Sequence, residues 1–293
     1  MGALPLTDSI TPLLDILALD EPIRIVDIGA NPIDGPAPYA PLLAAGLATV
    51  IGFEPQEDEL ARLIAAKSEG ETYLPYAVGE GGELPLHLCA YSGWTSTLRP
   101  DPRSLDLFRM FGTNPTITGE ITVSTRRLDD IAEVGPIDYL KIDIQGGEPA
   151  VFRNGRAKLA NVLMVQSEIS FFPLYERQPP FGEIDLLLRE FGLLPHHFDN
   201  VKKGIMAPMQ LGNDPFRALN QVLEADLVYA RDLRDHAALP DVALRKMAAI
   251  AHVCYGSFDL AMNCVMRLRD RGAARASAVE DYVALVNTPG VMR

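Results

Sequence analysis

Residues 23–31, with the sequence IRIVDIGAN, decide the fold class of this chain of 293 residues. The apolar run predicts a buried strand, and Asp27 followed by Gly29 predicts a tight turn at the carboxyl end of that strand. Glycine in such a turn lets the backbone approach a ligand closely, and the next helix offers free N–H groups. A lone glycine turn can also be purely structural, so the interpretation depends on the rest of the chain.

Strand-like and helix-like segments alternate around this stretch. Further strands are expected at residues 48–54, 71–78, 137–144, 161–169, 193–199 and 222–233, and helices at 8–19, 38–46, 57–69, 148–155 and 181–192. Two more strands, 84–90 and 116–128, flank a Gly-, Pro- and Ser-rich loop at 92–102. The alternation predicts βαβ units, and hence a Rossmann-like α/β fold with a mostly parallel seven-stranded sheet and an N-terminal helix.

The pattern becomes purely helical near the C-terminus, with helices expected at 240–257, 258–272 and 273–287. We therefore divide the chain into a domain at 1–235 and a helical tail at 236–293. The tail resembles a tetratricopeptide hairpin, but a single such unit cannot bury a repeat core by itself. This favours a tail that packs on the domain, or on a second subunit in a homodimer, over a peptide receptor.

Composition excludes several classes of partner. The net charge of −13 argues against nucleic acid, whose binding depends on clustered Lys and Arg. The three cysteines, Cys89, Cys254 and Cys264, have no CxxC spacing and indicate neither a disulfide framework nor a zinc site, and no other metal site is expected. No basic and apolar export signal opens the chain, and the longest apolar stretch, 41–53, is too short to span a bilayer. We expect a cytoplasmic protein without a membrane span.

Acidic residues stand at the predicted ends of three further strands. Glu54 follows the second strand, where one carboxylate can accept hydrogen bonds from both ribose hydroxyls of a nucleoside cofactor. Alternatively, Glu54 serves the start of the next helix. A nicotinamide dinucleotide is disfavoured, because Asn31 and Pro32 stand where its loop has a second glycine. Asp143 and Glu168 end neighbouring strands and are expected to converge on one pocket, although Asp143 could instead cap the helix near Glu148.

With these residues in view, the chain resembles the FkbM family of methyltransferases between about Ile25 and Asp232. The resemblance is carried by six segments: VDIGAN, IGFEPQ, AVGEGGELPLHL, SGWTSTL, LKIDIQGGEPAVFRNG and QSEISFFPLYERQPPF. It departs from the family at Gln145, where Glu is common, and in the longer, proline-rich loop 31–41.

The resemblance implies a methyltransferase that uses S-adenosylmethionine and methylates a hydroxyl of a sugar, glycan or natural-product acceptor. The expected cofactor site comprises Asp27, Gly29, Ala30, Asn31, Glu54, Pro55, Ala77, Val78 and Asp143. Two other classes stay open. A degenerate domain would act as a binding module, and a nicotinamide-dependent oxidoreductase would use a different nucleotide.

Deprotonation of an aliphatic hydroxyl calls for a base within hydrogen-bond reach. The predicted catalytic residues are Asp143 and Glu168, while His87, His196 and His197 have suitable pKa values but are more often packed or surface imidazoles. Residues expected on the acceptor side are Trp94, Thr95, Ser96 and His197. Trp94 could equally anchor its loop, and we expect Phe171, Phe172 and Tyr175 to form an apolar wall.

Overall fold

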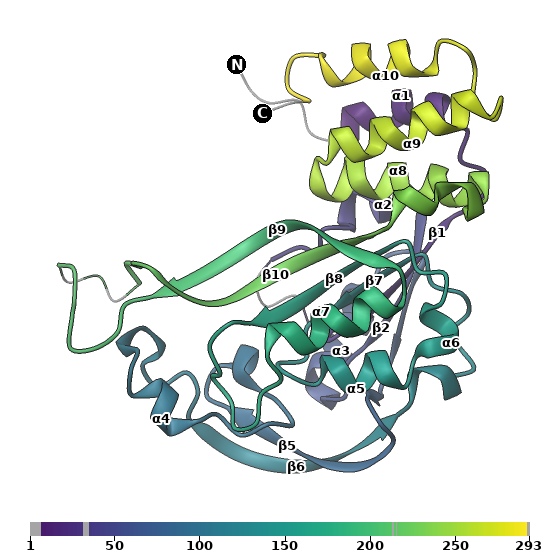
Figure 1. Cartoon of the computed structure of the whole chain (residues 1–293). Helices are drawn as coiled ribbons and strands as arrows, with labels where there is room; N and C mark the ends of the chain where they lie inside the picture. The colour runs from purple at the N-terminus through teal and green to yellow at the C-terminus, as the bar shows by residue number, and fades with distance from the viewer. Residues whose placement is uncertain (1–6, 32–34, 213, 215, 292–293) are drawn as a thin grey trace.

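In the computed structural model, which describes residues 7–31, 35–212, 214 and 216–291, a seven-stranded sheet forms the centre of the molecule (Figure 1). Its strand order is β3-β2-β1-β7-β8-β10-β9. The strands are β1 (Ile23–Ile28), β2 (Ala48–Phe53), β3 (Glu71–Leu74), β7 (Tyr139–Ile142), β8 (Met164–Ser170), β9 (Leu193–Gly204) and β10 (Gln221–Arg231). Strand β10 alone runs antiparallel to its neighbours, β8 and β9. The predicted mostly parallel seven-stranded sheet is therefore confirmed.

A second, three-stranded sheet covers one side of the molecule and was not predicted as a unit. It pairs β4 (Ala77–Val78) with β6 (Ile117–Arg126), and β6 with β5 (Gly82–Cys89). The prediction of one strand over residues 71–78 is wrong, because the chain leaves the large sheet after Leu74 and enters the small sheet at Ala77. Pro75 lies at this break, where a residue without an N–H cannot continue a ladder of hydrogen bonds.

Helices cover both faces of the large sheet. They are α1 (Thr7–Leu17), α2 (Ala40–Ala44), α3 (Glu57–Ala66), α4 (Pro102–Leu105), α5 (Glu148–Arg153), α6 (Arg156–Leu159), α7 (Phe181–Glu190), α8 (Asp241–Tyr255), α9 (Phe258–Asp270) and α10 (Ala278–Val286). Short 3₁₀ turns lie at Ser92–Trp94, Arg109–Phe111, Leu128–Asp130 and Leu233–Ala238. One core joins α5, α6 and α7 to one face of the sheet, and another joins α1, α2 and α8–α10 to the opposite face, which we call the α8 face.

The C-terminal helices pack on the domain through a continuous apolar core. Figure 1 shows α8, α9 and α10 stacked above the sheet, with α1 among them. Lys246 of α8 is only 2% exposed, and its Nζ lies 2.9 Å from Oδ2 of Asp138, just before β7. The boundary at 235/236 and the homodimer through these helices stay predictions. Within the described residues, no helix is both long and apolar enough to cross a membrane.

On the α8 face, the side chains of the strands change from apolar to polar toward one end of the sheet, and the candidate site lies at the polar end. Side chains on one face recur every second residue. In β1 the series is Ile23, Ile25 and Asp27, and in β8 it is Met164, Gln166 and Glu168. The apolar members pack under the C-terminal helices. The polar members lie nearer the carboxyl ends of the parallel strands, so that half of the face is left for a ligand.

Candidate active site

A cavity of about 920 Å³ lies over the carboxyl ends of β1, β2 and β7. That volume is at the upper end of the roughly 300–1,000 Å³ typical of small-molecule sites. Every residue predicted for the cofactor site lines it: Asp27, Gly29, Ala30, Asn31, Glu54, Pro55, Ala77, Val78 and Asp143. Residues 32–34 of the proline-rich loop lie outside the described residues. The cavity is large enough for a nucleoside cofactor and a second molecule together.

Gly29 brings the ends of β1 and β7 into contact. Its φ is +83°, and a Cβ at this position would lie 2.0 Å from the carbonyl oxygen of Asp143. A side chain here would therefore push β7 away. The N–H groups of Gly29 and Ala30 both donate to the carbonyl of Phe53, at 3.2 Å each. The glycine thus serves the packing of the turn first, and it sets Asp143 directly beside the turn.

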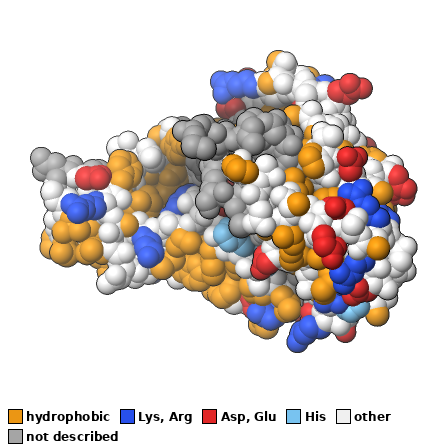
Figure 2. Space-filling view, turned by 90° about the horizontal axis from the view of Figure 1, so that it is seen from above, with side chains coloured by type: hydrophobic (Ala, Val, Ile, Leu, Met, Phe, Trp, Pro, Cys, Tyr) orange, Lys and Arg blue, Asp and Glu red, His pale blue; other side chains and the backbone are white. Residues whose placement is uncertain are grey.

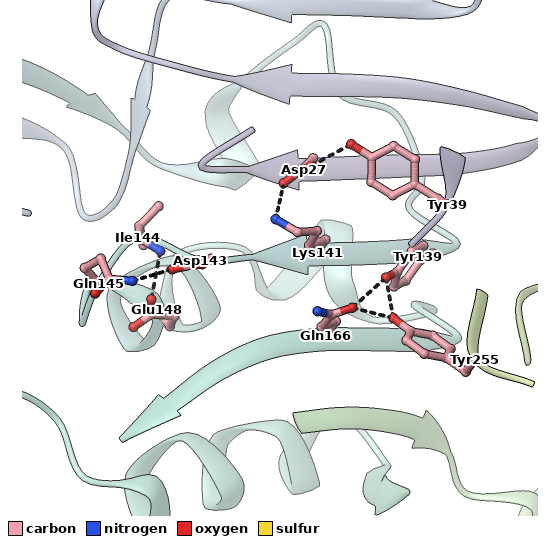
Figure 3. A network of polar contacts seen from close by, with 10 residues as sticks. All are labelled: Asp27, Tyr39, Tyr139, Lys141, Asp143, Ile144, Gln145, Glu148, Gln166 and Tyr255. Atoms are coloured by element: carbon pink, nitrogen blue, oxygen red, sulfur yellow. Dashed lines mark hydrogen bonds and ion pairs between the residues drawn. The ribbon is translucent and has the colours of Figure 1, made fainter. Parts of the chain in front are cut away.

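Asp27 is held by two neighbouring side chains in the interior (Figure 3). Its Oδ2 accepts a hydrogen bond from the Tyr39 hydroxyl at 2.6 Å, and Nζ of Lys141 lies 3.3 Å from Oδ1. Burial raises the pKa of Asp27, while Lys141 and Tyr39 oppose that rise. Asp27 is thus already engaged by Lys141 and Tyr39. The neighbouring Asp143, which also lines the cavity, has no ion pair with Lys141.

Glu54 contacts the chain just before a helix and also lines the cavity, and its role in ribose binding stays a prediction. The residue is 3% exposed, and its Oε1 accepts the N–H of Gln56 at 2.8 Å, just before α3. The side chain of Gln56 also lies close to this carboxylate. Burial raises the pKa of the Glu54 carboxyl, and the N–H and the side chain of Gln56 oppose the rise. A buried carboxylate on the wall of a cavity suits the hydroxyls of a ribose.

Gln145 joins the two predicted catalytic acids. Its Nε2 donates to Oδ1 of Asp143 and to Oε2 of Glu168, both at 2.8 Å, and Figure 3 shows the contact with Asp143. The Tyr175 hydroxyl donates to its Oε1 at 2.9 Å. Asp143 lines the cavity, whereas Glu168 is not among the lining residues. Burial, reinforced by the charge of Asp143, raises the pKa of Glu168 well above its usual range.

Glu148 closes the loop between β7 and α5. Its Oε1 accepts the N–H groups of Ile144 and Gly146 at 3.0 and 3.3 Å. Burial raises the pKa of Glu148 to about 7. The N-cap residue of α5 is Gly147 and no side chain caps that helix, so Asp143 does not act as its cap.

Three of the four residues predicted for the acceptor side line the cavity. They are Trp94, Thr95 and Ser96. Trp94 also packs edge-on against Phe111, with ring centroids 4.8 Å apart, so it anchors its loop as well. Ser96 is fully buried, and its hydroxyl donates to the Gln145 carbonyl at 2.8 Å.

The predicted histidines lie elsewhere. His197 has a side chain 43% exposed on β9 and is not among the residues that line the cavity. His87 belongs to the small sheet, with Nδ1 3.0 Å from Oε2 of Glu120. Nε2 of His196 lies 2.9 Å from the Ser257 hydroxyl. Of the predicted apolar wall, Phe171 packs against Phe181 and is exposed at the surface.

Sequence reasoning missed a group of polar residues from the middle of the sheet. Lys141, Gln166, Lys202, Glu224 and Asp226 all line the cavity. The signal was present in the period-two pattern: in β10, Glu224, Asp226, Val228 and Ala230 share one face. Within the described part of the chain, no group of three or more His, Cys, Asp or Glu side chains is arranged to hold a metal ion.

Comparison with known proteins gives three kinds of similarity. A family model described as the methyltransferase FkbM domain matches residues 27–194. The 2-O-methyltransferase NoeI of Sinorhizobium fredii is 40% identical over 79 residues, which cover 26% of this chain and 32%, about a third, of that protein.

Solved structures give a weaker similarity. The magnesium protoporphyrin IX methyltransferase of Synechocystis with bound S-adenosylmethionine has a TM-score of 0.34 at 11% identity, over 78% of this chain and 81% of that chain. The precorrin-6y C5,15-methyltransferase of Geobacter metallireducens has a TM-score of 0.34 at 10% identity, over 76% of this chain and 88% of that chain.

Proposed function

Because this chain belongs to the FkbM family of S-adenosylmethionine-dependent methyltransferases, we propose that it methylates a hydroxyl group of a sugar, glycan or natural-product acceptor. The observation that carries the proposal is the pair of carboxylates, Glu54 and Asp143, that face one cavity from the ends of strands β2 and β7. The name of the partial relative, a 2-O-methyltransferase, supports transfer to oxygen. Family membership also disfavours the nicotinamide-dependent alternative.

The donor end of the cavity fits S-adenosylmethionine. Glu54 would accept hydrogen bonds from the ribose hydroxyls, and Ala77 and Val78 would offer small apolar contacts to the adenine. When bound, the cofactor supplies a methyl group that its sulfonium makes electrophilic.

The protein then has to orient a hydroxyl and hold its proton. Asp143 is the predicted base that reaches the cavity, and the Gln145 amide fixes the position of its carboxylate. Glu168 supports this arrangement from behind, because the same amide nitrogen also contacts its Oε2. Burial favours the protonated form of Glu168, so we assign it a positioning role and Asp143 the contact with the acceptor.

Methyl transfer with carbon-labelled S-adenosylmethionine tests the proposal. The protein would be incubated with a panel of alcohols, sugars, amines and thiols, and the product methyl carbon would be assigned by NMR to oxygen, nitrogen or sulfur. We expect an O-methyl product. Asp143→Asn should lower kcat by about 10²–10⁴-fold, while Glu57→Gln on the exposed side of α3 should leave it unchanged. Labelled N-methyl or S-methyl products alone would contradict the proposal.

A further inference from the structure

We propose that Gln166 of β8 and Asp226 of β10 form the acceptor subsite and bind hydroxyls of a neutral, polyhydroxylated molecule. The inference rests on the proposed O-methylation and names the residues that recognise its acceptor. Both side chains line the cavity on the side away from Glu54, since β8 and β10 lie beyond β7 in the sheet while β2 lies before β1.

Gln166 presents an oriented donor to the cavity. It is 5% exposed, and its Oε1 accepts hydrogen bonds from the hydroxyls of Tyr255 at 2.8 Å and Tyr139 at 3.3 Å. Among the described residues its Nε2 has no hydrogen-bond partner. Figure 3 shows this nitrogen on the side of the amide opposite the two tyrosines. A buried amide that is satisfied at one end and unpaired at the end facing a cavity is placed to bind a ligand oxygen.

Asp226 presents an acceptor beside that donor. It lies opposite Glu168 in the antiparallel pairing of β10 with β8, so Gln166 is its diagonal neighbour on the same face. Diagonal neighbours are about 7 Å apart between Cα atoms, a spacing that two hydroxyls of one sugar ring can bridge. Within the described residues, Asp226 makes no hydrogen bond and no ion pair. The pairing of β10 with β9 is irregular at this point, a feature common beside active sites.

The charges around this subsite favour a neutral acceptor. Nζ of Lys202 lies 2.7 Å from Oε1 of Glu224, and Lys141 is paired with Asp27. The cation lining the cavity that has no described partner, Arg177, is exposed on the loop after β8. A sugar phosphate or uronic acid would therefore meet the carboxylates of Asp226 and Asp143, for which the described residues provide no ion-pair partner, and no free cation on the floor of the cavity.

The C-terminal helices set the orientation of Gln166. Tyr255 is the last residue of α8, and its hydroxyl contacts both Gln166 and the hydroxyl of Tyr139. Without the Tyr255 hydroxyl, the amide of Gln166 would keep one weaker partner and could rotate. Tyr255 is thus a positioning residue of the subsite, and it links a segment far along the chain to acceptor binding.

Binding of two probes to the protein saturated with S-adenosylhomocysteine tests the subsite. Methyl β-glucoside represents a neutral polyol and glucose 6-phosphate its anionic counterpart, and saturation-transfer NMR would report their dissociation constants. For methyl β-glucoside we expect binding to weaken about tenfold in Asp226→Asn and in Gln166→Met, and about threefold in Tyr255→Phe. Asp235→Asn, at an exposed position in the turn Leu233–Ala238 and not among the residues that line the cavity, is the matched control and should bind as the wild type does.

Calorimetry with S-adenosylhomocysteine shows in the same samples whether each variant is folded and keeps its donor site. Equal glucoside affinity in both Asp226→Asn and Gln166→Met overturns the subsite, as does failure of the wild type to bind the glucoside or a preference for glucose 6-phosphate. Transfer of the labelled methyl group to other hydroxyl acceptors would then leave the proposed function standing. Transfer to nitrogen or sulfur alone would instead remove the proposed function.

Discussion

Glu54 is the single residue on which donor binding should depend most. Glu54→Gln keeps the volume and one acceptor oxygen but removes the charge that favours two ribose hydroxyls. We expect the affinity for S-adenosylhomocysteine to fall at least about tenfold, or about 1.4 kcal/mol. Isothermal calorimetry measures this directly. An unchanged dissociation constant would mean that Glu54 serves only the N–H of Gln56 at the start of α3.

Asp226 should give the reaction a pH dependence near neutrality. Burial raises its pKa to about 6, with Asp143 adding to the rise and Lys202 and Lys141 opposing it. Asp199 on β9 adds to the rise as well, and Glu168 faces Asp226 from β8. An ionised carboxylate accepts a stronger hydrogen bond than a carboxyl group. The value of kcat/KM for the acceptor should therefore rise as the pH increases through about 6.

Asp226→Asn should flatten that part of the pH profile. The variant should also be at least as thermally stable as the wild type at pH 8. A carboxyl whose pKa is raised by folding lowers stability as the pH rises through its folded pKa, and an amide does not. An identical pH profile in the variant would assign the titration to another group.

At the scale of single residues, the sequence predicted the cavity-lining residues at the proposed donor end, but not Gln166 and Asp226 at the proposed acceptor end. Gly29, Glu54 and Asp143 follow strands directly, and the carboxyl ends of parallel strands meet at one edge. Gln166 and Asp226 lie inside strands, where their roles depend on which strands are neighbours. His197 was predicted on the acceptor side, but it lies in β9, whose pairing with β10 is broken by register shifts.

Helix α8 is the element that ties the C-terminal region to the sheet. Lys246 contacts Asp138, which also receives hydrogen bonds from Arg24, two from the guanidinium and one from the backbone N–H. Burial would raise the pKa of Asp138, but these hydrogen bonds hold it below its usual range. The pair therefore contributes stability above the ordinary carboxyl pKa, and this stability is lost as the pH falls through the folded pKa.

Lys246→Met should lower the free energy of unfolding by about 3 kcal/mol, because a buried carboxylate loses one of its two cationic partners. Urea denaturation at pH 7 measures the change. Lys67→Met, at an exposed position after α3, is the control and should change stability by less than about 0.5 kcal/mol. Equal midpoints for the two variants would show that Arg24 alone satisfies Asp138.

Elements whose pattern is local were the easiest to predict. The strands β1 and β7 are short, mostly apolar runs followed by turns, and they occur where the sequence pattern places them. The error at residues 71–78 arose because the sequence pattern does not show which strands pair with each other: Leu74 belongs to the large sheet and Ala77 to the small one. The predicted strand 193–199 also ended too early: β9 continues to Gly204, because β10 pairs with it as far as Gln221, past the last pair of β10 with β8 at Glu224.

At the scale of the whole molecule, exposed apolar side chains gather at the projecting end of β9 and β10. Figure 1 shows the two strands extending away from the body, and Figure 2 shows hydrophobic side chains gathered on that side. The exposed apolar residues of β9 and the connection that follows it are Phe198, Val201, Met206, Met209, Phe216 and Leu219. The opposite end of the sheet instead has its apolar side chains covered by α8–α10.

Because α8–α10 cover these apolar side chains, we expect a chain that ends at residue 235 to be unstable. Removal of α8–α10 would expose apolar side chains of the sheet at Ile23, Ile25, Val50, Met164 and Val228, all buried in the same core. Re-exposure of each would cost about 1.5–3 kcal/mol, and the total is comparable with the roughly 5–15 kcal/mol of a whole domain. We expect the shortened chain to show no cooperative thermal transition by circular dichroism.

A chain ending at residue 287, just after α10, keeps the covering helices and should melt as the full chain does. Binding of S-adenosylhomocysteine distinguishes the two ways in which the expectation could fail. If the 235-residue chain melts cooperatively and binds as tightly as the full chain, residues 236–293 are a dispensable tail and the predicted boundary is a true domain boundary. If it melts cooperatively but loses acceptor binding alone, the C-terminal helices act mainly through Tyr255 and Gln166, and the apolar contacts beneath them contribute less than their burial suggests.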